Sequence, residues 1–435
     1  MLDLTTEADL IHKEYLNALE KRECRLFPGY NLKQILFNET LICQKLGEKY
    51  IHQAYRKSLL MNPCVIEKDI RHRRILTFYT KNYRIDHDGY WDMICADVGE
   101  HDDIRILSRG NYLKRFAPFL LLRKLGWYRI AYEDLDCIEN SLHRMYLAVC
   151  LVSRKWTLDE IEKLELNPKA CMCYFDSSRD ENVVMQYFKK QGAVTITNQH
   201  GQSVFESFEY DRLNQSQLLN FKCDYFLAKG EKQREQLIAA GVDGEKVRLI
   251  GIVGDTGSEL HHTRSDNNNV VIGVYLDCPT FSFAEKTNFE MISIVQKASE
   301  EGGYKYFLKP HPADVKERYL EILDGNCIGI FGKEDKLRDT FDKASIAVIS
   351  ASATYVDACF YGIRCLKYDS EISYPIAFAE DCFSDTKELK DKTDSWIRTD
   401  QENKRKYLEN IIKIYNSGWE PGKVQKTIET LLETR

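Results

Sequence analysis

Two histidines each follow a short apolar run of the chain. His311 lies between two prolines after residues 306–308, and His200 lies before a glycine after residues 193–197. Runs of this length are typical of buried strands, and proline and glycine end them. A neutral imidazole at a strand end can accept a proton from an attacking hydroxyl, and a charged one can stabilise a phosphate. The pattern places both histidines where proton transfer or anion binding is chemically possible, although His200 could instead hydrogen-bond a neighbouring loop.

Small hydroxyl side chains follow another apolar run. Residues 346–349 lead into Ser350, Ser352 and Thr354, and a helical pattern comes next. The first N–H groups of a helix have no backbone partner, and the helix dipole favours an anion at that end. We therefore expect these hydroxyls to bind a phosphate group.

Strand and helix patterns alternate from about residue 167 onward, which is typical of parallel sheets covered on both faces. The expected helices are 180–190, 231–240 and 289–299, and the expected strands are 171–175, 193–197, 223–227, 247–250, 270–275, 306–308, 346–349 and 363–368. Open parallel sheets bind ligands outside the carboxyl ends of their strands. Both histidines and the hydroxyl residues therefore belong at the binding edges of such sheets.

A polar stretch, residues 256–269, lacks apolar periodicity and predicts a hinge between two domains. A chain of 435 residues is also too long for one compact core. We expect an α/β protein with two Rossmann-like parallel-sheet domains facing a central cleft, at residues 1–260 and 268–400. The first domain would carry a helical N-terminal segment, and residues 401–435 would form C-terminal helices.

Three neighbouring features resemble the C-terminal half of GT-B glycosyltransferases. They are the motif Lys309-Pro310-His311-Pro312, the motif Ser350-x-Ser352-x-Thr354, and the following helix with Asp357 and a Tyr-Gly turn. They are most similar to the group that includes CDP-glycerol glycerophosphotransferases of teichoic acid synthesis and CMP-sugar transferases such as bacterial sialyl- and Kdo-transferases. The resemblance covers roughly residues 170–370. It implies a GT-B fold in which the first domain binds the acceptor and the second binds the nucleotide donor. The last helices would pack back on the first domain.

The resemblance also implies roles for individual residues. His200 would act as general base, while His311 would stabilise charge on the leaving phosphate. The nucleotide and its phosphates would contact Lys309, Pro312, Ser350, Ser352, Thr354, Asp357, Thr280 and Ser282. The acceptor would contact Gln199, Gly201 and Gln202, although Gln199 stands where the CDP-glycerol enzymes usually carry an aromatic residue. Neither a metal nor a cofactor is required, because hydroxyls and backbone N–H groups already face the anion.

The expected reaction is transfer of a sugar from a CMP-, CDP- or UDP-linked donor to a hydroxyl of a cell-surface polysaccharide, a capsule or a lipid-linked glycan. Two alternatives stay open: transfer of glycerol or ribitol phosphate from a CDP-polyol, and a non-catalytic subunit that binds nucleotide or glycan. Histidines in both halves favour catalysis, because a pure binder needs no base facing the phosphates. A UDP-sugar epimerase is disfavoured because its carboxylate-rich motifs are not evident. The sequence has no P-loop and no GxGxxG, so kinase and dehydrogenase functions lack support.

The composition favours a cytoplasmic globular protein. The net charge is −6 with 29 % charged residues, so no basic field points to nucleic acid. The 14 cysteines are scattered without a CxxC pair, which favours reduced core thiols over disulfides or a metal site. The N-terminus lacks the basic and apolar regions of a signal peptide, and no run approaches the roughly 18 apolar residues of a membrane span.

Two stretches could contact a membrane surface that holds a lipid-linked acceptor. The basic cluster at residues 71–74 could meet anionic headgroups, or it could be a solvated patch. Residues 112–132 interleave aromatic and basic side chains and could form an interfacial element. The alternative is a core helix with charged residues on its outer face, because Pro118 and Gly126 interrupt a long amphipathic surface. Peripheral membrane association therefore stays open.

Overall fold

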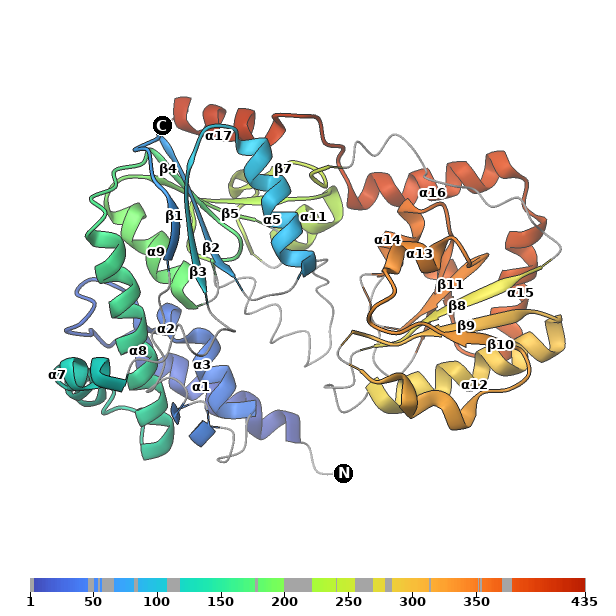
Figure 1. Ribbon diagram of the computed structural model, residues 1–435, viewed down its shortest axis with the longest axis horizontal. Coiled ribbons are helices and arrows are strands. Elements are labelled where there is room, and N and C mark those ends of the chain that lie inside the picture. The colour runs from blue at the N-terminus through green and yellow to red at the C-terminus, as the bar shows by residue number, and fades with distance from the viewer. Residues whose placement is uncertain are drawn as a thin grey trace.

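The computed structural model contains two parallel-sheet domains, one at each end of its long axis (Figure 1). The described residues are 4–45, 51–53, 55–56, 66–81, 85–107, 118–176, 179–198, 221–239, 241–254, 269–277, 284–312, 314–350, 352, 354–369 and 378–434. The predicted hinge, residues 256–269, lies almost wholly outside them.

The described residues of the first domain form a seven-stranded sheet in the order β1-β3-β2-β4-β5-β6-β7. Its strands are β1 (Ile66–Asp69), β2 (Ile75–Lys81), β3 (Asp102–Leu107), β4 (Ala170–Cys173), β5 (Val194–Asn198), β6 (Tyr225–Ala228) and β7 (Val247–Leu249). Neighbouring strands run parallel, except that β1 is antiparallel to β3. The helices around the sheet are α5 (Ile85–Val98), α9 (Arg179–Lys190), α11 (Glu231–Ala239) and the 3-10 turn η1 (Gly244–Lys246).

A group of helices packs beside this sheet around its own apolar core (Figure 1). They are α1 (Leu4–Glu20), α2 (Leu32–Ile35), α3 (Phe37–Lys45), α7 (Pro118–Asp134) and α8 (Ser141–Glu162). Arg154 on α8 forms a buried ion pair with Glu39 on α3, with 2.6 Å between guanidinium nitrogen and carboxylate oxygen. Loss of either partner would leave a buried charge, so this pair fixes how the N-terminal helices dock.

Helix α7 confirms a packed helix within residues 112–132 but corrects two details. Pro118 is its first residue, a position where the missing N–H has no intrahelical partner to lose, and the helix continues through Gly126. Lys124 is buried, with its ammonium over the rings of Trp127 and Trp156. The expectation that the charged residues lie on the outer face is therefore wrong for Lys124, because aromatic faces hold the cation inside.

The described residues of the second domain form a six-stranded, all-parallel sheet in the order β10-β9-β8-β11-β12-β13. The strands are β8 (Val271–Tyr275), β9 (Lys305–Lys309), β10 (Cys327–Ile330), β11 (Ile346–Ile349), β12 (Cys365–Tyr368) and β13 (Cys382–Phe383). The order reverses between β8 and β11, which is the switch point where parallel sheets bind ligands. The helices are α12 (Ala284–Gly302), η2 (Lys316–Ile322), α13 (Leu337–Phe341), α14 (Thr354–Phe360), η3 (Ala379–Asp381) and α15 (Thr386–Arg398).

The end of the chain connects the two domains. Helix α16 (Gln401–Tyr415) contributes to the apolar core of the second domain, whereas α17 (Lys423–Glu433) contributes to that of the first. Asp97 at the end of α5 accepts hydrogen bonds from the backbone of Gly422 and Val424, at 2.6 and 2.8 Å. The C-terminal helices expected within residues 401–435 are thus α16 and α17, and the crossing between them brings the chain back to the first domain (Figure 1).

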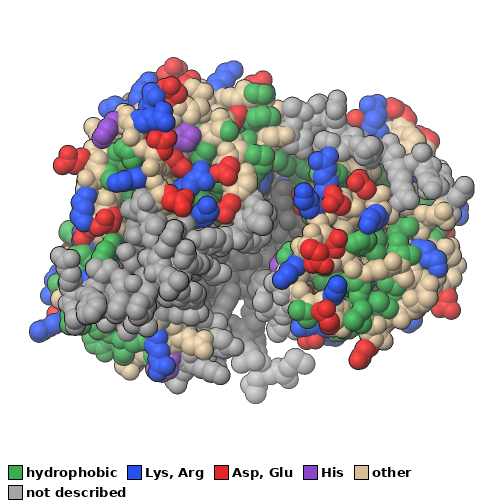
Figure 2. Space-filling view, viewed as in Figure 1, with side chains coloured by type: hydrophobic (Ala, Val, Ile, Leu, Met, Phe, Trp, Pro, Cys, Tyr) green, Lys and Arg blue, Asp and Glu red, His purple; other side chains and the backbone are tan. Residues whose placement is uncertain are grey.

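The fold class predicted from sequence, α/β with two Rossmann-like parallel-sheet domains, is confirmed. The twelve described cysteines are free thiols, nine buried and three half-buried, as expected. None of the described helices combines the length and the hydropathy that a bilayer crossing needs. Basic and acidic side chains alternate over the face in Figure 2 rather than gathering in a patch of one sign.

Candidate functional site

The carboxyl edge of the second sheet carries the predicted phosphate-binding residues. His311 is half-buried and follows β9, and Ser350 is buried directly after β11. One strand, β8, separates β9 from β11. At a spacing of about 4.8 Å per strand, the two strand ends lie roughly 10 Å apart. The structure therefore places these residues on one edge, at a separation that a nucleotide could bridge and a single phosphate could not.

The Ser-x-Ser-x-Thr segment leads into α14. The Ser352 hydroxyl donates to Oγ1 of Thr354 at 2.8 Å and accepts from the Thr354 backbone N–H at 3.2 Å. Both side chains remain half-exposed. The local hydrogen bonds give the two hydroxyls a defined position, and their exposure leaves room for a ligand.

A chain of buried polar groups holds the loops after β8 and β9 against each other. The Asn288 side chain accepts from the Asp277 N–H at 3.0 Å and donates to the Asp277 carbonyl at 3.2 Å. It also contacts the Tyr319 hydroxyl, which donates to Asp314 at 2.6 Å. The Asp314 N–H in turn donates to the carbonyl of His311 at 2.8 Å. The sequence analysis missed this network, which fixes the turn that carries His311.

The other residues of the KPHP motif point to different roles. The Lys309 side chain is buried and its ammonium donates to the carbonyl of Gly332, in the turn after β10. Burial lowers the pKa of Lys309 from its usual value. Pro312 is exposed in the turn. Lys309 therefore ties two neighbouring strand ends together, while His311 remains the polar side chain of the motif at the edge.

The carboxyl edge of the first sheet carries Asn198 and Lys229. Asn198 is the buried last residue of β5, and Lys229 follows β6. The Lys229 ammonium lies 4.3 Å from the centre of the Tyr90 ring on α5, a cation–π contact. The sequence analysis missed Lys229, although Ala228-Lys229-Gly230 follows a buried strand and precedes a helix, as the predicted site residues do.

Lys229 and Asp357 interact between the two domains. Desolvation lowers the pKa of Lys229 to about 8, and the negative charge of Asp357 partly offsets this fall. Desolvation also raises the pKa of Asp357 to about 6, and Lys229 partly offsets this rise. Water nevertheless reaches both side chains, because Asp357 is exposed and Lys229 is half-buried. Both groups are therefore mostly charged at pH 7.

A buried carboxylate, that of Asp381, holds the first turn of α14 in place. Asp381 accepts from the Tyr355 hydroxyl at 2.6 Å, from the Arg364 guanidinium at 2.7 Å and from the Tyr407 hydroxyl at 2.7 Å. Burial raises the pKa of Asp381, and the Arg364 charge works against that rise. These groups come from α14, from residues next to β12, from η3 and from α16. They hold the helix whose first residues are the predicted phosphate ligands.

Several predicted residues lie outside the described part of the chain. They are His200, Gln199, Gly201 and Gln202 after β5, and Thr280 and Ser282 after β8. Asn198 and Asp277, which precede these two segments, lie at the carboxyl edges of their sheets. The roles of the six residues stay predictions.

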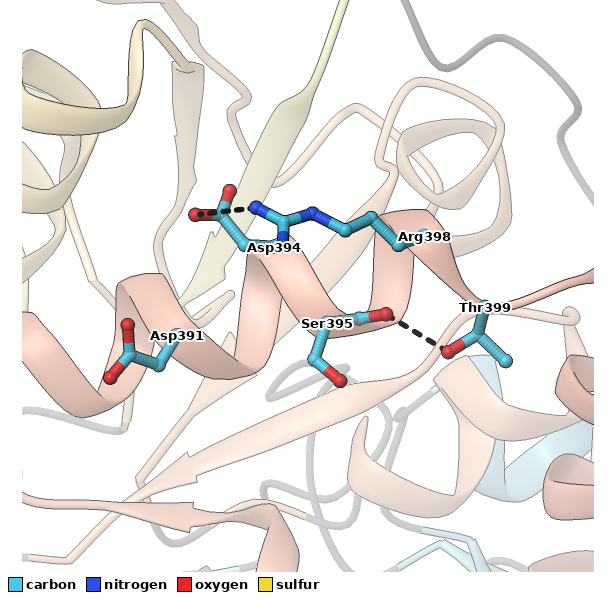
Figure 3. A pocket seen from close by; sticks show the side chains of 5 residues that line it. All are labelled: Asp391, Asp394, Ser395, Arg398 and Thr399. Atoms are coloured by element: carbon cyan, nitrogen blue, oxygen red, sulfur yellow. Dashed lines mark hydrogen bonds and ion pairs between the residues drawn. The ribbon is translucent and has the colours of Figure 1, made fainter.

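A depression of about 400 Å³ lies elsewhere, along the outer side of α15 (Figure 3). Its lining residues all come from α15 and the residue after it: Asp391, Asp394, Ser395, Arg398 and Thr399. Asp394 and Arg398 form an exposed ion pair across one helical turn at 3.9 Å. Helix α15 is on the side of the second domain remote from the first (Figure 1), so this depression is not part of the candidate site.

No protein-family model matches the chain, and no curated protein sequence matches it. Several solved structures are similar to the chain. A glycotransferase of kitacinnamycin is 12 % identical, with a TM-score of 0.49, over 84 % of this chain and 99 % of that one. The UDP-GlcNAc 2-epimerase of Methanocaldococcus jannaschii, with UDP-GlcNAc and UDP, is 11 % identical, with a TM-score of 0.48, over 83 % and 99 %.

A variant of the wall teichoic acid polymerase TagF is 11 % identical, with a TM-score of 0.39, and the match covers 99 % of this chain and 97 % of that one. The similar structures thus include a glycotransferase, a polymerase and an epimerase. At these identities they assign no reaction and no residue to this chain.

Proposed function

We propose that this protein is a glycosyltransferase that moves a sugar from a nucleotide-activated donor to a hydroxyl acceptor. The proposal rests on one observation above all: Lys229, at the carboxyl edge of the first sheet, is electrostatically coupled to Asp357, which belongs to the helix at the carboxyl edge of the second. The two carboxyl edges therefore lie within electrostatic reach of each other, which suits a reaction between two separately bound substrates.

The donor site of this proposal is the edge of the second domain. Ser350, Ser352 and Thr354 offer hydroxyls, and His311 offers a ring nitrogen, at the switch-point side of the sheet. Lys229 adds a cation from the opposite domain. Hydroxyls, an imidazole and an ammonium suit the phosphates of a nucleotide better than they suit an uncharged sugar.

In the proposed reaction the acceptor oxygen attacks the anomeric carbon of the donor sugar. The bond from that carbon to the phosphate oxygen breaks, and the nucleotide leaves with the electron pair. The acceptor proton passes to His200, which follows β5 in the first domain. Attack at phosphorus instead would transfer a polyol phosphate from a CDP-polyol and release CMP.

Nucleotide binding is the first test. We expect calorimetry to detect one of CMP, CDP, UDP or GDP, and we expect His311→Ala to weaken that binding by about fivefold or more, the equivalent of one lost hydrogen bond. His52→Ala, at an exposed histidine of the N-terminal segment, is the control and should bind normally. Equal affinity of wild type and His311→Ala would remove His311 from the donor site.

Turnover is the second test. General-base catalysis typically supplies about 10²- to 10⁴-fold in rate, so His200→Ala should lose turnover by that order while it keeps its donor affinity. Incubation with UDP-sugars and with CDP-glycerol, followed by product analysis, separates sugar transfer from polyol-phosphate transfer. Nucleotide binding without turnover of any donor would favour the non-catalytic subunit. Interconversion of a free UDP-sugar would instead reveal an epimerase.

A further inference from the structure

We propose that Cys95, His101 and Asp103 form a zinc site at the amino-terminal edge of the first sheet, separate from the transfer reaction. One ligand atom from each of the three residues lies within 4.8 Å of the other two. Zinc–ligand bonds are about 2.0–2.3 Å, which sets neighbouring tetrahedral ligands roughly 3.5 Å apart. The three side chains would therefore need to close by only about 1 Å around an ion.

The hydrogen bonds around the cluster orient the three side chains as metal ligands are usually oriented. His101 Nδ1 lies 2.7 Å from the carbonyl of Gly99. A carbonyl can only accept, so Nδ1 carries the proton and Nε2 keeps its lone pair for a metal. The Thr77 hydroxyl donates to Asp103 Oδ1 at 2.7 Å and lies 3.8 Å from Cys95 Sγ. One buried hydroxyl thus holds two of the three groups.

The charges also balance. A divalent ion with one thiolate, one carboxylate and one neutral imidazole is electrically neutral as a unit. Arg105 donates to Asp103 Oδ2 at 2.6 Å and to Asp92 at 2.7 Å, so its own charge is paired. Each carboxylate oxygen of Asp103 accepts one of these hydrogen bonds and keeps a further lone pair.

The donor set selects the kind of metal. A thiolate and an imidazole disfavour magnesium and calcium, which prefer oxygen ligands. Zinc accepts sulfur, nitrogen and oxygen ligands together in a four-coordinate site. Three protein ligands leave the fourth position for water.

The location argues for a stabilising role. Cys95 lies in the last turn of α5, and Asp103 is the second residue of β3, so the ion would join the end of a helix to the start of a strand. The candidate transfer site lies at the opposite, carboxyl-terminal edge of the sheet. Asp97, in the same turn of α5, accepts the backbone hydrogen bonds that dock α17. Zinc would therefore fix the element on which the end of the chain rests.

The test uses full-length, tag-free, reduced protein that has been treated with a chelator. We expect competition titration with zinc chloride to show one tight equivalent, and we expect zinc to raise the thermal midpoint. His101→Ala, at a half-exposed position where folding should survive, should weaken zinc binding at least about tenfold and abolish the thermal shift. His52→Ala, an exposed histidine elsewhere, should bind zinc as wild type does.

Cobalt identifies the sulfur ligand. Wild-type protein loaded with Co²⁺ should show a thiolate-to-metal charge-transfer band, which Cys95→Ser should lose and Cys137→Ser should keep. If Cys95→Ser does not fold, the wild-type spectrum and His101→Ala decide the question. The proposal is overturned by the absence of one bound equivalent, by equal zinc affinity in His101→Ala, or by a wild-type cobalt spectrum without a thiolate band.

Discussion

The pKa of Lys229 is set by the surroundings of the residue at the end of β6. Its ammonium lies over the Tyr90 ring and within the electrostatic reach of Asp357, and desolvation lowers the pKa of Lys229 to about 8. A lysine in open solvent keeps a pKa near 10.4. In the proposed function, Lys229 can therefore lose its positive charge within the pH range in which most enzymes are assayed.

This shift predicts a pH dependence of donor binding. The lowered pKa means that Lys229 in the free protein is protonated below about pH 8 and neutral above it. The phosphates of a nucleotide sugar carry no proton that titrates in this range. Donor affinity should therefore be constant from pH 7 to 7.5 and fall roughly tenfold by about pH 9.5, because a charge-assisted contact is lost. Calorimetry across this range is the measurement.

Two substitutions make the assignment specific. Lys229→Arg keeps a positive charge at every pH tested, so its affinity should not fall above pH 8. Lys229→Met should bind more weakly at pH 7 and lack the pH dependence. A decline that persists unchanged in Lys229→Met would have to come from another group.

Helix α14 depends on support from outside itself. It has seven residues, too few for a stable isolated helix, and its first residues carry the predicted phosphate ligands. Tyr355 in its first turn donates to the buried Asp381, which also pairs with Arg364. The position of the Ser352 and Thr354 hydroxyls therefore depends on a carboxylate that belongs to η3.

Asp381→Ala should destabilise the second domain strongly. It removes the partner of the buried Arg364 charge and of the Tyr355 and Tyr407 hydroxyls, and such losses cost about 3–5 kcal/mol in the free energy of unfolding. Tyr407→Phe is the matched control, because it removes one hydrogen bond to the same carboxylate and should cost about 1 kcal/mol. Denaturant unfolding monitored by tryptophan fluorescence measures both. Similar losses in the two variants would contradict the central role of Asp381.

The two domains meet where the chain crosses back after α16. A side chain on Gly230, next to Lys229, would place its Cβ 2.3 Å from the carbonyl carbon of Tyr415. The neighbouring Ser417 N–H donates to the Lys229 carbonyl at 2.9 Å, and the Asn416 side chain accepts from the Ile252 N–H at 2.9 Å. Close backbone contact at Gly230 therefore sets how the first domain approaches the crossing segment next to Lys229.

Gly230→Ala should disturb this approach. Because the clash is with backbone atoms, the crossing segment must shift, and we expect weaker donor binding together with a lower thermal midpoint. Gly126→Ala is the control: nothing lies within 4 Å of its Cβ position, and alanine in the α7 helix should be neutral or stabilising by up to about 1 kcal/mol. Wild-type behaviour of Gly230→Ala would show that the crossing tolerates a shift without cost.

Strand ends and helix starts could be predicted from the sequence wherever a short apolar run and the residues directly after it mark them. The buried strands β4, β5, β9 and β11 are short apolar runs closed by proline, glycine or polar residues, so His311 and the hydroxyls of Ser350 to Thr354 were placed at strand ends without coordinates. Strands β1, β3, β10 and β13 were not predicted; β1, β10 and β13 are edge strands, and β3 lies next to the edge strand β1. The residues of β10 are half-buried or exposed, so it lacks the continuous apolar run that marks a central strand.

Contacts between distant parts of the chain could not be read in this way. The coupling of Lys229 to Asp357, the hold of Asp381 on Tyr355, and the cluster of Cys95 with Asp103 and His101 arise because separate strands and helices end at the same place. Apolar periodicity records which face of an element is buried, and it carries no information on which other element covers that face. Packing supplies that partner, and with it the burial and the neighbouring charges that set the chemistry of each side chain.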